Sequence, residues 1–179
     1  RRFHGLNFSY DAEMIRRDVE LTVITNESRF SRLSVRAKGD YLQELMDELE
    51  DLYPGIRVDG FIVNDRDEAP FYRFSLERGE MRSYSLMEDL ARELNREENR
   101  YGHLRFNFRV REETEGSVLV KLEGDFAAAD EVWQEENMAD FTLWAEGLFE
   151  WSGEVLGRPV TGQVTDRLNE TLLLRRMGE

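Results

Sequence analysis

A strand-like alternation that ends in a glycine occurs three times along the chain, and this repetition constrains the fold most. In each segment apolar and polar residues alternate, and a charged residue, a glycine and an acid follow, at Gly39, Gly79 and Gly124. Alternation with a period of two is typical of a strand with one buried face. Glycine adopts positive φ at little cost where a chain turns. Because a helical pattern follows each glycine, the sequence predicts three strands that each lead into a helix.

A second alternating run precedes each of these strands, over residues 19–23, 56–62 and 104–110. The joining segments 26–29, 64–68 and 112–116 are polar, which is typical of hairpin turns. The predicted fold is therefore α+β, with a β-hairpin–helix (ββα) unit used three times. The units span about 19–54, 55–101 and 102–157, and a C-terminal segment covers 158–179. We expect one domain over residues 1–179, with a mainly antiparallel or mixed sheet and helices packed on one face.

Three amphipathic helices are predicted from apolar spacing and capping residues. The first begins at Asp40 and ends before Pro54, the second begins at Ser85, and the third is a long helix from Ala128 to Leu156. The element order from Leu33 to Val110 resembles that of a ferredoxin-like fold, a fold that implies no function by itself. Residues 10–17 are expected to form a short helix. The pattern over 163–175 fits either a strand or a helix.

Composition restricts the class of protein. The chain has no cysteine, so it can form neither disulfides nor thiolate metal sites. No apolar run approaches the roughly 18 residues of a membrane span, and no signal-peptide pattern is present. We therefore expect a soluble, cytoplasmic protein that does not bind membranes. The formal net charge of −14 disfavours broad nucleic-acid binding.

The sheet face away from the helices is the first candidate binding surface. Alternate strand residues on that face are basic with some aromatics, although the chain as a whole is acidic. The candidate residues are Phe61, Phe71, Arg73, Arg105 and Arg109. Arginine binds carboxylate or phosphate with two parallel hydrogen bonds, and aromatic rings can pack on a partner. Two alternatives are ordinary cross-strand ion pairs in solvent, and a face covered by the C-terminal segment or a second subunit.

The last predicted helix carries the second candidate surface. Trp144 and Trp151 belong to an apolar stripe with Phe141, Leu148 and Val155, spaced alternately by three and four residues. This spacing occurs at helix–helix seams and favours an interface with a partner or a second copy. Core packing is the alternative, because any helix that faces a core shows such a stripe.

No catalytic residue, metal ligand or cofactor site is predicted. The chain has only two histidines, His4 and His103, and lacks both a Gly-x-Ser-x-Gly elbow and a glycine-rich phosphate loop. We therefore expect a non-enzymatic acidic module that acts through protein–protein contacts or self-association. One alternative is a small enzyme or ligand-binding domain with a pocket between sheet and helices. The other is nucleic-acid binding on the Arg–Phe sheet face.

Overall fold

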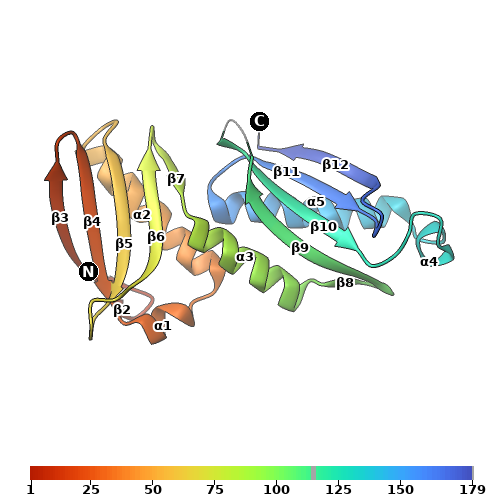
Figure 1. The fold of residues 1–179 in the computed structure, drawn as a ribbon, viewed down its shortest axis with the longest axis horizontal. Helices are drawn as coiled ribbons and strands as arrows, with labels where there is room; N and C mark the ends of the chain where they lie inside the picture. Colours follow the sequence, from red (N-terminus) through yellow and green to blue (C-terminus); the bar gives the residue numbers. More distant parts are fainter. Residues whose placement is uncertain (114–115, 179) are drawn as a thin grey trace. The chain divides into compact units, whose positions relative to one another are not determined.

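The alternating runs form two separate five-stranded mixed sheets, so the chain is an α+β protein (Figure 1). The computed structural model describes residues 1–113 and 116–178. These fall into two compact units, Arg1–Leu86 and Met87–Glu179, which we call unit 1 and unit 2. A single domain over the whole chain stays a prediction.

Unit 1 contains a sheet with the strand order β3-β4-β5-β6-β7. The strands are β3 (Ser9–Ile15), β4 (Asp18–Thr25), β5 (Arg57–Asn64), β6 (Pro70–Glu77) and β7 (Glu80–Arg82). Strands β4 and β5 are parallel, and the other neighbours are antiparallel. The parallel pair is connected through α1 (Glu27–Ser31) and α2 (Val35–Leu52), and a small hairpin of β1 (Arg2–Phe3) and β2 (Leu6–Asn7) precedes the sheet.

Unit 2 contains a sheet with the strand order β12-β11-β10-β9-β8. The strands are β8 (Arg100–Tyr101), β9 (Leu104–Glu112), β10 (Val118–Gly124), β11 (Val160–Thr165) and β12 (Thr171–Met177). Strands β10 and β11 are parallel and are connected through α4 (Glu131–Gln134) and α5 (Met138–Leu156). Helix α3 (Tyr84–Glu97) contains the boundary between the two units.

The two units share one connectivity. Each has an antiparallel hairpin, a short helix, a long helix and a second antiparallel hairpin. In each, the last strand of the first hairpin is parallel to the first strand of the second hairpin. Parallel neighbours require a long crossover, and the helix pair supplies it. The repeated element is therefore a hairpin–helices–hairpin unit used twice. The prediction of three ββα units is wrong.

The predicted strand at 33–40 is the main cause of that error. Ser34 instead caps α2, and its Oγ accepts a hydrogen bond of 3.2 Å from the Ala37 N–H. Gly39 is buried inside the helix rather than at a turn, and Asp40 is not the cap. Leu33, Val35 and Ala37 alternate with polar residues, as in a strand. However, Ser34 is a favourable N-cap residue, and the apolar residues after it recur at helical spacing, so the same segment also fits a helix. Without this strand the stretch from Leu33 to Val110 begins with α2 instead, and its last strand, β9, belongs to the other sheet, so the predicted ferredoxin-like order is not confirmed.

Further boundaries differ from the sequence prediction. Residues 10–17 form β3 and its turn rather than a helix, and the strand alternative is correct for Leu172–Leu174 in β12. Ser83 rather than Ser85 caps α3, because its Oγ accepts a 3.1 Å hydrogen bond from the Leu86 N–H. The long third helix is interrupted, and α5 begins after its cap Asn137.

The predicted turns have three different outcomes. Residues 64–68 form the tip of the β5–β6 hairpin, as predicted, and the Asn64 side chain donates to Asp67 at 3.0 Å. Residues 26–29 contain the start of α1 and are not a hairpin turn. The turn at 112–116 includes residues 114 and 115, which lie outside the described residues.

The long helix of each unit packs on one face of its own sheet. In unit 1, Tyr41 and Leu42 of α2 are buried together with Val23 and Ile62 of the sheet. In unit 2, α5 approaches β11 so closely that a Cβ on Gly162 would lie 2.1 Å from the Phe149 ring. This contact identifies the sheet face that α5 covers, and the opposite face carries the alternate residues.

Candidate binding surfaces

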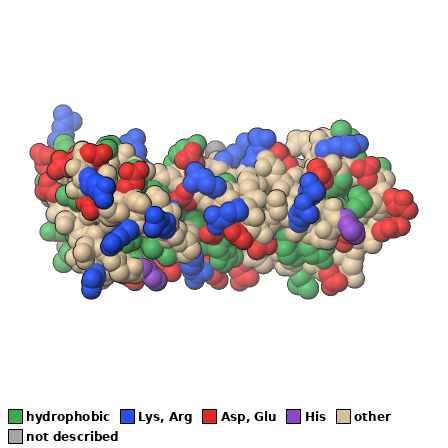
Figure 2. Space-filling model, turned by 90° about the horizontal axis from the view of Figure 1, so that it is seen from below, with side chains coloured by type: hydrophobic (Ala, Val, Ile, Leu, Met, Phe, Trp, Pro, Cys, Tyr) green, Lys and Arg blue, Asp and Glu red, His purple; other side chains and the backbone are tan. Residues whose placement is uncertain are grey.

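The candidate residues of the sheet face lie on two different sheets. Phe61, Phe71 and Arg73 are on β5 and β6 of unit 1, whereas Arg105 and Arg109 are on β9 of unit 2. The expected single Arg–aromatic face is therefore divided into two faces with different charges. On the side of the molecule drawn in Figure 2, basic and acidic side chains are interspersed. The separation of charge becomes visible only when the strand registers are followed.

The outward face of the unit 2 sheet is basic. Gly162 faces α5, and its partner Val120 and the opposite Val110 share that face, so the alternate residues face away. We call the outward cations of this sheet the basic sheet face: Arg100, Arg105, Arg109, Arg111, Lys121 and Arg176. Among the described outward residues of these strands, Glu123 is the only acid.

Glu123 pairs with only two of the cations on the basic sheet face. Glu123 forms ion pairs of 3.1 Å with Arg109 and 3.2 Å with Lys121. Arg105 and Arg111 have no acidic partner in the described ranges 1–113 and 116–178. Both are exposed, so their guanidinium groups are available to a carboxylate from another molecule.

A cavity of about 460 Å³ lies at the end of the basic sheet face. Its lining includes Arg105, Glu123, Thr165, Asp166 and Asn169. Thr165 is fully buried, and its hydroxyl has no hydrogen-bond partner among the described residues. The lining is therefore polar and of mixed charge, with one buried hydroxyl whose hydrogen-bonding capacity is unused.

Asp166 organises the β11–β12 turn beside this cavity. Its carboxylate accepts hydrogen bonds from the N–H groups of Ala128 at 2.9 Å, Leu168 at 2.9 Å and Glu170 at 2.8 Å. These bonds, above all the one from Ala128, lower the pKa of Asp166 below its ordinary value. The group is thus held ionised and has a structural role. The sequence signals for this turn are Asp166 itself, whose side chain accepts from the backbone two residues on, and Asn169, a residue type that tolerates the left-handed φ of 65° found there.

The outward face of the unit 1 sheet carries the aromatic candidate residues, Phe61 and Phe71. Phe61 lies opposite Arg73 in the register, and the Arg73 guanidinium carbon is 4.9 Å from the centre of the Phe61 ring. Acids dominate the neighbouring outward positions of β3, β4 and β5: Asp11, Glu13, Asp18, Glu20 and Asp59. Phe71 is half-buried, with its ring centre 5.7 Å from that of Phe30. This face is acidic rather than basic.

Trp144 and Trp151 of α5 have different surroundings. Trp144 is half-buried in an aromatic cluster, with ring centres 5.0 Å from Tyr101, 5.7 Å from Phe106 and 5.6 Å from Phe141. Phe141 and Val155 of the same stripe are fully buried. The core-packing alternative therefore describes Trp144 and most of the stripe.

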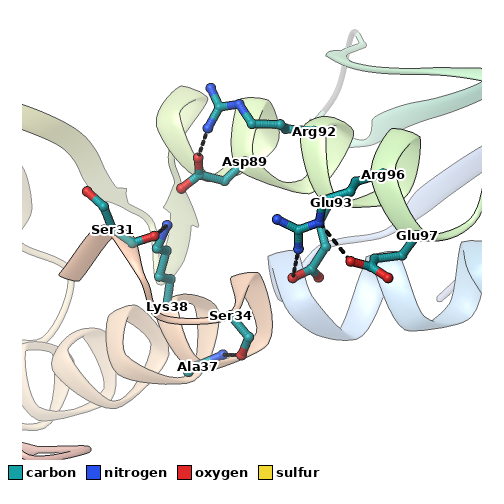
Figure 3. Close-up of polar contacts among 9 residues, drawn as sticks. All are labelled: Ser31, Ser34, Ala37, Lys38, Asp89, Arg92, Glu93, Arg96 and Glu97. Atoms are coloured by element: carbon teal, nitrogen blue, oxygen red, sulfur yellow. Dashed lines mark hydrogen bonds and ion pairs between the residues drawn. The ribbon is translucent and has the colours of Figure 1, made fainter. Parts of the chain in front are cut away.

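Trp151 instead lines a groove of about 420 Å³ with Leu94 and Leu148. The same groove is lined by Glu93, Glu97 and Glu98 near the end of α3. Figure 3 shows Arg96 bridging two of these acids, with contacts of 3.8 Å to Glu93 and 2.7 Å to Glu97. The groove combines an indole surface with carboxylates that are partly neutralised.

Metal and membrane sites receive no support from the described residues. In that part of the chain no three His, Asp or Glu side chains are grouped closely enough to hold a metal ion. None of the described helices is both long and apolar enough to cross a bilayer. The chain matches no protein-family model, and comparison with curated proteins gives no match.

Proposed function

We propose that this chain is a non-enzymatic binding module that acts through protein–protein contacts, and that its basic sheet face captures an acidic segment of a partner protein. The observation that supports the proposal is the concentration of Arg and Lys on one outward sheet face, where the described residues include a single acid, in a chain of net charge −14. A local field of this kind attracts an acidic ligand against the charge of the whole chain.

The spacing of the arginines favours an extended ligand. Side chains on one face of a strand recur every second residue, which is about 6.8 Å. Arg109 and Arg111 follow this repeat on β9, and Arg105 lies two repeats from Arg109. An extended peptide with acids at alternate positions has the same repeat, so several carboxylates can meet arginines at once.

An acidic protein segment fits this face better than single-stranded nucleic acid does. Proteins that bind single strands use aromatic side chains on which bases stack. The outward positions of β9–β12 within the described residues carry no aromatic side chain, and the half-buried Phe61, with its neighbour Arg73, belongs to the acidic sheet of unit 1. Nucleic-acid binding is therefore the weaker alternative.

Enzymatic activity also has less support than binding. The cavity beside the basic sheet face is large enough for a small ligand, since ligand sites start at about 300 Å³. However, its buried carboxylate, Asp166, has a lowered pKa and three backbone partners. A general acid or base requires a pKa near the working pH.

The proposal is tested by fluorescence anisotropy with a labelled peptide in which glutamate alternates with serine. The wild-type protein and an Arg105→Ala/Arg111→Ala variant are compared at low and physiological salt. Two charge-assisted contacts are lost in the variant, so we expect about tenfold weaker binding, which corresponds to about 1.4 kcal/mol. An Arg17→Ala/Arg66→Ala variant is the control, because it removes the same charge from exposed turns of unit 1.

Two results would contradict the proposal. One is equal binding by the double variant and the control variant. The other is tighter binding of a single-stranded RNA oligonucleotide than of the peptide, with a steep salt dependence that reports phosphate contacts.

A further inference from the structure

The sheet of unit 1 ends in an unusually open strand, β3, which Figure 1 shows at the sheet edge. All seven of its residues are exposed, including Met14 at 61% and Ile15 at 46%. Natural edge strands are commonly protected by charged side chains, especially lysine, by proline or by a β-bulge. Strand β3 has no proline and no register shift with β4, and its only charged side chains are the acids Asp11 and Glu13, which repel an acidic strand but not a basic one.

The hairpin geometry determines which backbone groups of β3 face the open edge. A two-residue turn, Arg16–Arg17, pairs Ile15 with Asp18. In such a hairpin the residues that flank the turn exchange hydrogen bonds, and the bonded pairs then alternate along the ladder. The N–H and C=O groups of Tyr10, Ala12 and Met14 therefore point away from β4, where they can bond to a further strand.

The side chains of β3 divide into an acidic face and a more apolar face. Tyr10 faces α2, because its hydroxyl lies 3.0 Å from that of Tyr41. Ala12 and Met14 share that side by alternation, and Asp11 and Glu13 lie on the other. A partner strand must match this pattern with charged residues on one side and apolar residues on the other.

A row of carboxylates crosses three strands beside this edge. Glu13 lies opposite Glu20, and Glu20 lies opposite Asp59. No ion pair joins any of the three to a cation in the described part of the chain. Like charges directly opposite each other in a sheet are destabilising. A cation placed next to Glu13 by an added strand would relieve this repulsion.

We propose that β3 is a docking edge for an extended segment of another protein in which Lys or Arg alternates with apolar residues. The segment adds a sixth strand, bonds to the backbone of Tyr10, Ala12 and Met14, and places its cations beside Asp11 and Glu13. Its apolar residues cover Ala12 and Met14. The inference does not depend on the basic sheet face, which belongs to unit 2.

Charge argues against a second copy of this chain as the occupant. Antiparallel pairing of two β3 strands about Ala12 would place Asp11 opposite Glu13 of the other copy, twice. Like charges directly opposite each other repel, as Glu13 and Glu20 already do within the sheet, so these pairs would destabilise a homodimer.

The test measures binding of a labelled heptapeptide with alternating lysine and valine to the full chain by fluorescence anisotropy. Ala12→Pro removes a backbone N–H that faces the open edge, and proline is tolerated at such positions. We expect this variant to bind the peptide at least about tenfold more weakly. Ala12→Ser keeps the N–H and is the matched control, with an affinity close to that of the wild type.

A peptide of the same composition with its lysines in one block controls for general attraction to an acidic protein. Equal binding of the two peptides, or an unchanged affinity of Ala12→Pro, overturns the proposal. Self-association in sedimentation experiments that Ala12→Pro abolishes also overturns it, because the occupant would then be a second copy. If Ala12→Pro fails to fold by circular dichroism, Asp11→Lys/Glu13→Lys replaces it. That variant must prefer a peptide with alternating glutamate and valine.

Discussion

Trp144→Ala and Trp151→Ala should destabilise unit 2 to clearly different extents, although both side chains are half-buried on α5. Replacing a fully buried Trp or Phe by Ala costs about 3–5 kcal/mol, so half-burial alone suggests about 2 kcal/mol. Trp144 also loses ring contacts with Tyr101, Phe106 and Phe141. Each aromatic pair contributes about 0.5–1.5 kcal/mol, but the three share one cluster, so we expect a total loss of about 3 kcal/mol.

For Trp151 the expected loss is smaller. It lines the groove with Leu94, Leu148 and three glutamates, and no aromatic ring among the described residues pairs with it. Truncation into an open groove leaves no closed cavity, so we expect a loss of about 1 kcal/mol. Trp151 is therefore the better of the two positions for testing partner binding without disturbing the fold.

The assay is urea unfolding followed by tryptophan fluorescence, with far-ultraviolet circular dichroism as a second probe. All three tryptophans, Trp133, Trp144 and Trp151, belong to unit 2, so fluorescence reports on that unit. Leu143→Ala is the control, because Leu143 lies on α5 with 70% of its surface exposed. Equal destabilisation by the two tryptophan variants would refute the distinction between core and groove.

Three further predictions concern stability. Asp166→Asn should reduce the loss of unfolding free energy at acid pH. Because the pKa of Asp166 is lower in the folded state, its carboxylate stabilises the fold above the unfolded pKa of about 3.9, and this stabilisation is lost as pH falls through the folded-state pKa. Urea unfolding between pH 2.5 and 6 checks this, and identical curves would count against it. Arg158→Met should cost about 2–4 kcal/mol, because the buried guanidinium bonds Glu112 at 2.6 Å and the Gly116 carbonyl at 2.8 Å; a double-mutant cycle with Glu112→Gln should show coupling. Gly162→Ala should cost about 1–3 kcal/mol in thermal or urea unfolding, since its Cβ would lie 2.1 Å from the buried Phe149 ring, whereas Gly147→Ala, with open space around it, should not destabilise.

The elements predicted correctly are those with long alternation and strong turn signals. Strands β5, β6, β9 and β10 match alternating runs, and the Asn64–Glu68 tip matches its polar composition. The end of α5 at Gly157 also follows from sequence, because glycine adopts the left-handed conformation there, with φ of 62°. These signals are local, so no knowledge of distant partners is needed.

The errors occur where a local pattern fits both a strand and a helix. Val35 and Ala37 alternate with polar residues, yet Ser34 caps a helix that includes them. In residues 10–17, Tyr10 and Met14 have helical spacing, yet the segment pairs with β4 as an edge strand. Pairing with a neighbouring strand supplies backbone hydrogen bonds that the segment alone cannot form.

By itself the sequence determined the α+β class, most of the strands and the residues that alternate on each strand. The tertiary structure decided how the strands are distributed between two sheets, and with it the separation of Arg105 and Arg109 from Phe61, Phe71 and Arg73. It also decided that β3 is an edge and that Trp144 is enclosed by Tyr101 and Phe106. The parallel pairs β4–β5 and β10–β11 join segments separated by whole helices. Their register depends on the packing of α2 and α5 against the sheets, and no pattern within a single segment contains that information.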